Sequence, residues 1–187
     1  MPQFQTIGID ASLTNTGVYY IFQDTDAKTV TRVGKVIVPP SGLSGHQRLD
    51  LIDREVRNFL IASPANLVVI EGYDYKGFSL VPLAEINGIL QLTAHRICGR
   101  VIHAAPAQVK KFATGKPQAS KIQIMKHFQI DNEHIADARA LAEIGQVFLG
   151  APSTRRCELE VAYALRQGKV KKSRPRSSGS RPNLVAL

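Results

Sequence analysis

The chain has 187 residues and a formal net charge of +9, and 44% of its residues are hydrophobic. This length suits one domain that buries a core without a disulfide or a structural metal. The two cysteines, Cys98 and Cys157, lie far apart and outside any zinc-binding spacing, so we expect a reducing compartment. Neither a signal peptide nor an apolar run long enough for a membrane span is found, which predicts a cytoplasmic protein without membrane contact.

Most of the excess positive charge lies at the C-terminal end of the chain. Residues 166–187 contain seven of the 24 basic residues and none of the 15 acidic ones, with Ser, Gly and Pro among them. A segment with so few apolar residues cannot offset the entropy of ordering. We predict a nearly neutral folded domain over residues 1–167 and a disordered basic tail over residues 168–187 that binds a polyanion. A tail that serves only solubility is the alternative.

The first part of the chain predicts a meander of three strands. Residues 4–10, 17–23 and 31–38 are rich in β-branched and aromatic residues, and polar turns separate them. The Pro-Pro-Ser-Gly sequence at residues 39–42 ends this pattern. In residues 46–62, apolar side chains recur every three or four positions, which predicts an amphipathic helix.

Strands and helices alternate in the rest of the chain. Four apolar residues at 67–70, followed by Glu71, are typical of a central strand that is buried on both faces. The remaining expected elements are a helix over 82–97 with Pro82 in its first turn, a strand over 100–104, and helices over 106–115, 121–128 (capped by Ser120), 132–149 and 152–167. This order predicts one α/β domain with helices on both faces of a mixed sheet.

Three carboxylates and a histidine stand where such a fold would collect them. Asp10 follows the first strand and Glu71 follows the buried one, so the two acids lie side by side if these strands are neighbours. His134 and Asp137 are three residues apart and project from one face of their helix. Grouped carboxylates repel one another unless a divalent cation lies between them. A pair of Mg²⁺ ions at such a site could clamp the attacking and leaving oxygens of a phosphodiester.

Each of these residues also has a purely structural explanation. Asp10 could cap the turn after its strand, and Glu71 could simply mark a strand end. Asp137 could favour the dipole of its helix, and His134 could be an ordinary surface or core histidine. Their joint occurrence at one expected site favours the functional interpretation.

Several segments resemble the RuvC-type Holliday junction resolvases of the RNase H-like nuclease superfamily. Residues 7–17 (IGIDASLTNTG) resemble the family's opening strand, catalytic Asp and glycine turn, and residues 69–71 (VIE) resemble the strand with the second acid. Residues 105–111 (APAQVKK) and 119–121 (ASK) resemble segments whose lysines contact DNA near the scissile phosphate. Residues 134–138 (HIADA) resemble the closing helix, whose first ligand position is Asp in some members and His in others.

The resemblance implies a fold, a site and a set of partners. The fold would be a five-stranded mixed sheet in the order 3-2-1-4-5 with helices on both faces. The enzyme would be a homodimer, paired through the helix over 82–97, that resolves four-way junction DNA by two opposed nicks with Mg²⁺ or Mn²⁺. Two ions would be held by Asp10, Glu71, His134 and Asp137, with proton delivery as an alternative role for His134. Lys110 and Lys121 would stabilise charge on the phosphate in the transition state, with ordinary phosphate binding or plain solvation as the alternative. The expected DNA contacts are Lys110, Lys111, Lys116, Lys121, Tyr73, Tyr75 and Phe78.

The basic tail is not part of the usual bacterial pattern of this family, and it suggests a phage- or mobile-element-borne version. Two other functions stay open. An actin-like ATPase or sugar-kinase half shares an opening of the type found at residues 7–17, but such enzymes need a second related domain, for which 187 residues leave no room. A branched-DNA-binding protein without catalysis is disfavoured because no expected metal position carries an apolar residue.

Overall fold

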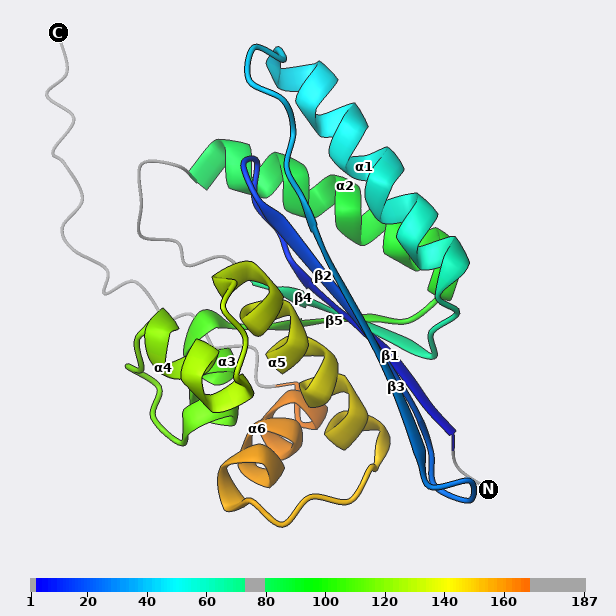
Figure 1. Cartoon of the computed structure of the whole chain (residues 1–187), viewed down its shortest axis with the longest axis vertical. Coiled ribbons are helices and arrows are strands. Elements are labelled where there is room, and N and C mark those ends of the chain that lie inside the picture. The colour runs from blue at the N-terminus through cyan, green and yellow to red at the C-terminus, as the bar shows by residue number, and fades with distance from the viewer. Residues whose placement is uncertain (1–2, 73–79, 169–187) are drawn as a thin grey trace, which may run out of the picture.

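A five-stranded mixed sheet lies between two layers of helices in the computed structural model, which describes residues 3–72 and 80–168 (Figure 1). The strands are β1 (Gln3–Asp10), β2 (Thr16–Asp24), β3 (Thr29–Ile37), β4 (Leu67–Glu71) and β5 (Val101–Ala104). Their order in the sheet is β3-β2-β1-β4-β5. The first three strands pair antiparallel, whereas β4 runs parallel to both β1 and β5. The predicted meander, the mixed sheet and the strand order are confirmed.

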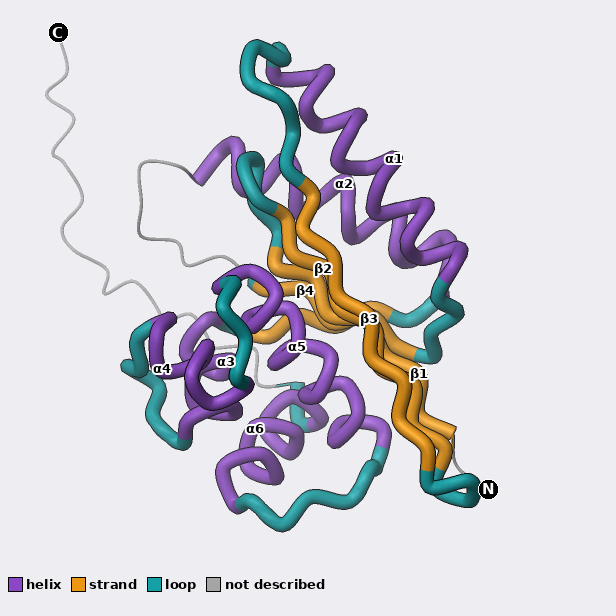
Figure 2. Tube along the Cα trace, viewed as in Figure 1, coloured by secondary structure: helices purple, strands orange, loops and turns teal. Residues whose placement is uncertain are grey.

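Helices cover both faces of this sheet, as the order of elements predicted (Figure 2). One face carries α1 (Gly45–Ala62) and α2 (Leu80–Cys98). The other carries α3 (Pro106–Thr114), α4 (Lys121–Phe128), α5 (Glu133–Leu149) and α6 (Arg156–Arg166). Because every strand side chain points to one face or the other, the sheet separates the apolar core into clusters on its two faces. Ile7 and Ile9 belong to the α1–α2 cluster, and Val69 belongs to the cluster beneath α3–α6.

Glycines let α5 lie directly on the sheet. A Cβ atom added at Gly8 of β1 would lie 1.9 Å from the carbonyl oxygen of Ala138, and one at Gly17 of β2 would lie 2.2 Å from that of His134. Both approaches involve backbone atoms, which cannot move aside as a flexible side chain does. The close packing of α5 therefore depends on these two residues, and it brings the first turns of α5 against the carboxyl end of β1.

Two helices begin two or more residues away from the predicted start. Helix α2 begins at Leu80 rather than Pro82, which is compatible with proline because the first N–H groups of a helix need no partner within it. Helix α6 begins at Arg156 rather than residue 152. The hydroxyl of Ser153 accepts a hydrogen bond from the Arg155 N–H, and the Arg155 guanidinium donates to the Ala113 carbonyl on α3. These contacts hold the segment extended, so the helix starts only after Arg155.

In the two described ranges, no helix is both long and apolar enough to cross a membrane. Helix α6 ends at Arg166. The division into a domain over 1–167 and a basic tail over 168–187 stays a prediction, since residues 169–187 lie outside the described residues.

Candidate functional site

Asp10 and Glu71 end two neighbouring strands and meet at one edge of the sheet. Ile9 of β1 pairs with Ile70 of β4 in parallel register, so the next residue of each strand emerges at the same level. The two carboxyl groups are close enough for Asp10 to affect the ionisation of Glu71 directly. Burial, and then the charges of Asp10 and Asp137, raise the pKa of Glu71 to about 8. The adjacency expected from the sequence is therefore present, and it carries a strong electrostatic cost.

Helix α5 supplies the other two expected residues. Nδ1 of His134 lies 2.8 Å from Oδ2 of Asp10, and this hydrogen bond raises the pKa of His134 above its ordinary value against the effect of burial. Asp137 is only 6% exposed. Burial, and next the charge of Asp10, raise its pKa to about 6. Asp10 thus shifts the pKa of each of the other three residues predicted for the site.

Local hydrogen bonds explain how the chain places these side chains. The Asn132 side chain accepts a hydrogen bond from the Ile135 N–H at 3.1 Å, which caps α5 so that His134 lies in its first turn. The turn after Asp10 is closed by Thr16, whose hydroxyl donates to the Ser12 carbonyl and accepts from the Ser12 N–H. The position of Asp10 is thereby fixed from the strand side and that of His134 from the helix side.

Lys121 is the one predicted lysine that the structure brings to the acids. Ser120 caps α4 by accepting from the Gln123 N–H, and Lys121, at the start of that helix, has Nζ 3.1 Å from Oε2 of Glu133. Burial lowers the pKa of Lys121, but its hydrogen bond to Glu133 and the charge of Asp137 together outweigh that effect and raise it. The lysine therefore stays charged beside the acids.

A cavity of about 500 Å³ opens at this place. Its wall is built from Asp10 and the following turn, His134, Lys121, Arg48 and the start of α2. Arg48 was not singled out from the sequence. The signal that could have found it is a basic residue near the start of a helix whose first turn contains no acid, where the helix dipole disfavours positive charge.

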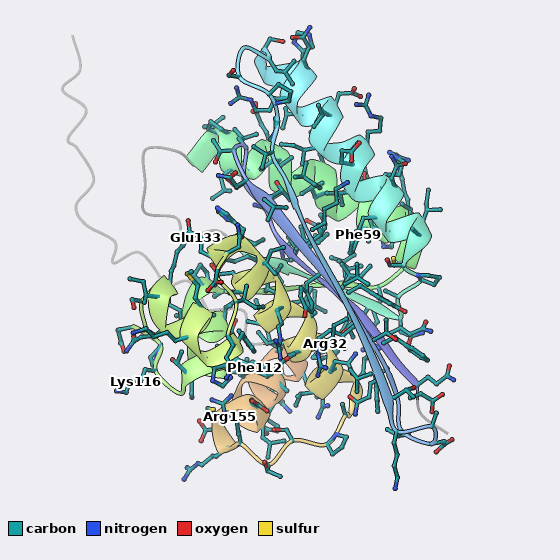
Figure 3. All side chains as sticks on the ribbon, in the orientation of Figure 1. Arg32, Phe59, Phe112, Lys116, Glu133 and Arg155 are labelled. Carbon is teal, nitrogen blue, oxygen red and sulfur yellow. The ribbon has the colours of Figure 1, made fainter. Side chains whose placement is uncertain are left out.

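The other predicted DNA-binding residues are not gathered at this cavity. Lys111 forms an ion pair with Glu160 of α6 at 2.7 Å, which directs it toward that helix. Lys110 is half-buried on α3 and Lys116 is exposed in the turn after it; Figure 3 shows Lys116 apart from Glu133, which marks the start of α5. Their predicted contacts with DNA stay predictions. Those of Tyr73, Tyr75 and Phe78 lie outside the described residues.

The donor atoms at this edge suit a hard divalent cation. Carboxylate oxygens are what Mg²⁺ and Mn²⁺ prefer, and a neutral imidazole can join them. The raised pKa values of Glu71 and Asp137 reflect repulsion that such a cation would relieve. Within residues 3–72 and 80–168, however, no three His, Cys, Asp or Glu side chains form a ready metal-holding group. Asp10 is instead hydrogen-bonded to His134. The residues fit the ion by their chemistry, and binding would replace this hydrogen bond.

Comparison with known proteins identifies a matching family and similar solved structures. Residues 6–144 match the family model described as crossover junction endodeoxyribonuclease RuvC. The protein of that name from Campylobacter jejuni is 30% identical over 121 residues, covering 63% of this chain and 74% of the relative. The Thermus thermophilus RuvC structure has a TM-score of 0.62 at 20% identity, covering 79% of this chain and 98% of the other. The same protein in complex with Holliday junction substrate has a TM-score of 0.60 at 19% identity, with the same coverage. At these identities, the two structures establish a shared fold.

Proposed function

Since the chain belongs to the crossover junction endodeoxyribonuclease RuvC family, we propose that it is a phosphodiester hydrolase that cleaves four-way junction DNA during recombination and repair. The observation that carries this proposal is the group formed by Asp10, Glu71, His134 and Asp137 at the carboxyl edge of the sheet. Its acids repel one another, and a cationic lysine stands beside them. This is the arrangement that metal-assisted cleavage of a phosphodiester requires.

Two divalent ions, Mg²⁺ or Mn²⁺, would be held by Asp10, Glu71 and Asp137, with His134 as the fourth ligand. When bound, they would supply Lewis acidity and an activated water. The acids come from two strands and one helix, and close backbone packing keeps these elements together. The protein's own contribution is therefore a rigid set of metal-ligating oxygen atoms, held on tightly packed elements.

Lys121 and His134 would act on the phosphate and the leaving group. Because the pKa of Lys121 is raised, its ammonium carries full charge near neutral pH and can stabilise negative charge that develops on the phosphate oxygens. The ion pair with Glu133 holds it at the cavity. The raised pKa of His134 makes its imidazole able to carry a proton near neutral pH. Delivery of this proton to the leaving oxygen is the alternative to its role as a ligand.

A homodimer is part of the proposal. A junction has two scissile strands related by a two-fold axis, and one site per chain serves one strand at a time. Helix α2 supports this, because it is apolar on two faces. Ile86 and Leu90 are buried in the core, whereas Val81 is 68% exposed and Leu92 is 48% exposed on the opposite side. Sedimentation at micromolar concentration should detect a dimer; monomer alone, with and without DNA, would contradict it.

We also propose that the C-terminal basic residues form a sequence-independent DNA-binding arm. The support is that residues 166–187 carry positive charge only, and such a segment is attracted to nucleic acid. We further propose that the enzyme acts in the bacterial cytoplasm. The phage- or mobile-element origin stays a prediction from the sequence.

The first experiment is cleavage of a labelled four-way junction with Mg²⁺ and with EDTA. We expect paired nicks that require the metal, and linear duplex of the same sequence as a poor substrate. Binding without any cleavage would favour the junction-binding protein instead. ATP hydrolysis without DNA cleavage would favour the ATPase or sugar-kinase alternative.

A further inference from the structure

Arg48 stands between the acidic site and the start of α1. It lines the cavity of about 500 Å³ that also contains Asp10, Lys121 and His134. It also lines a second cavity of about 230 Å³ that reaches Gly45, the first residue of α1. The two cavities share Leu13, Arg48 and Pro82 as walls. The recess that begins at Asp10 therefore continues past the guanidinium along the start of this helix.

The guanidinium of Arg48 has few hydrogen-bond acceptors among the described residues. Its Nη2 atom donates to the Leu43 carbonyl at a long 3.4 Å. Its Nε atom is buried and finds no hydrogen-bond acceptor among residues 3–72 and 80–168. Glu85 lines the second cavity, but no ion pair joins it to Arg48 in those ranges. A buried charged donor without an acceptor is costly, which points to an acceptor that arrives from outside.

The other basic side chains of the recess already have partners. Lys121 is bound to Glu133 at 3.1 Å, and His134 is bound to Asp10 at 2.8 Å. Helix α1 adds to the imbalance around Arg48, because its first turn contains no acid and the positive end of its dipole faces the same region. No ion pair among the described residues neutralises Arg48, and an anion beside it would be stabilised by the guanidinium and by the helix dipole.

We propose that Arg48 binds a phosphate of the cleaved DNA strand next to the scissile one, so that this strand runs from Asp10 toward the start of α1. The inference rests on the proposed function, since it assumes DNA at the acidic site. The planar guanidinium can donate two parallel hydrogen bonds to one phosphate, and Nε is one of the donors in that geometry. The contact contributes to substrate binding in ground state and transition state alike, so it lowers KM and leaves kcat unchanged.

The test compares Arg48→Gln with Arg54→Gln, a control that removes an exposed base from the same helix. Junction binding is measured by fluorescence anisotropy in EDTA over a range of salt concentrations. We expect Arg48→Gln to weaken binding about tenfold and to reduce the slope of log affinity against log salt by about one unit. Arg48→Lys, which keeps the charge but not the fork, should retain most of the slope. Arg54→Gln should match the wild type.

Neutral methylphosphonates placed singly along the cleaved strand locate the contact. In the wild type, one position beside the scissile phosphate should weaken binding about tenfold; in Arg48→Gln the same substitution should have no further effect, because the contact is already lost. If Arg48→Gln fails to fold by circular dichroism, the scan is repeated with Arg48→Lys, which should show a smaller loss at that position. An equal loss at every position in wild type and variant would overturn the inference.

Kinetics separate this inference from the proposed function. With wild-type enzyme that cleaves junctions, Arg48→Gln should raise KM about tenfold and leave kcat on saturating junction within about twofold. A fall in kcat at unchanged KM, or unchanged binding and salt slope, would overturn the role of Arg48 while the nuclease function stands. Wild-type protein that binds junctions but never cleaves them would refute the proposed function. The anisotropy scan would still test whether Arg48 contacts a phosphate.

Discussion

His134 and Asp10 lie 124 positions apart in the sequence and are joined by a hydrogen bond of 2.8 Å between Nδ1 and Oδ2. The bond links the first turn of α5 to the end of β1. It raises the pKa of His134, and it engages one imidazole nitrogen and one carboxylate oxygen that a metal would otherwise bind. The same contact is therefore compatible with a ligand role and with a proton-donor role.

Substitution at this position distinguishes the two roles. Because aspartate can bind a divalent ion as histidine does, His134→Asp should retain at least about ten times the cleavage rate of His134→Ala. Single-turnover cleavage with saturating Mg²⁺, and again with Mn²⁺, provides the measurement. An equal loss in both variants would instead favour proton delivery to the leaving oxygen.

Removing one carboxylate should separate binding from chemistry. Asp10→Asn, Glu71→Gln and Asp137→Asn should each slow cleavage by more than about 100-fold, the upper range for losing a residue that only supports a metal ligand. Junction affinity in EDTA should stay within about threefold, since DNA binding depends mainly on bases and phosphates. A variant that still cuts at nearly the wild-type rate would exclude that residue from the site.

The metal-free protein should lose stability as the pH rises. The folded pKa values of about 8 for Glu71 and about 6 for Asp137 exceed the ordinary values of 4.5 and 3.8. The folded state therefore holds protons that the unfolded state has already released. The contribution of these two protonated carboxyls to the free energy of unfolding is complete below about pH 4 and is lost between about pH 4 and pH 8.

Thermal unfolding in EDTA should accordingly show a falling Tm across this pH range. Added Mg²⁺ should raise the Tm more at pH 8 than at pH 5, because it competes with protons for the carboxylates. The variant Glu71→Gln should show a shallower pH dependence in EDTA. An identical pH dependence in this variant and the wild type would contradict the raised pKa of Glu71 as its cause.

Backbone contact at Gly8 should be essential for the fold as well as for the site. In Gly8→Ala the new Cβ atom would meet the Ala138 carbonyl at 1.9 Å, so α5 must shift, at a cost of about 1–3 kcal/mol or more. Gly45→Ala in the first turn of α1 is the control, since an added Cβ there has nothing within 4 Å and alanine is the better helix former. Urea unfolding measures both; equal stability of the two variants would contradict this packing.

Deletion after Gln167 tests the C-terminal bases. This truncation removes six of the seven basic residues of the segment 166–187. If about half of them neutralise phosphates, the slope of log affinity against log salt should flatten by about 2–3 units. The cleavage rate on saturating junction should barely change. A truncated protein with an unaltered slope but no cleavage would mean that the segment completes the site.

The sequence by itself determined the secondary-structure elements and which residues are candidates for the site. Alternation and helical periodicity are local properties, so the strands, most helix ends and the positions of Asp10 and Glu71 after two strands could be predicted within a few residues. The spacing of His134 and Asp137 likewise guaranteed a shared helix face.

Contacts between distant segments were decided only by the tertiary structure. The parallel pairing of β1 with β4 brought two strand-end acids close enough for the charge of Asp10 to raise the pKa of Glu71. Lys121 and Lys111 are equally basic in the sequence, yet one faces the acids and the other is paired with Glu160. Arg48 reaches the same cavity from α1. Charge, burial and hydrogen-bond partners depend on distances through space, which local sequence patterns do not encode.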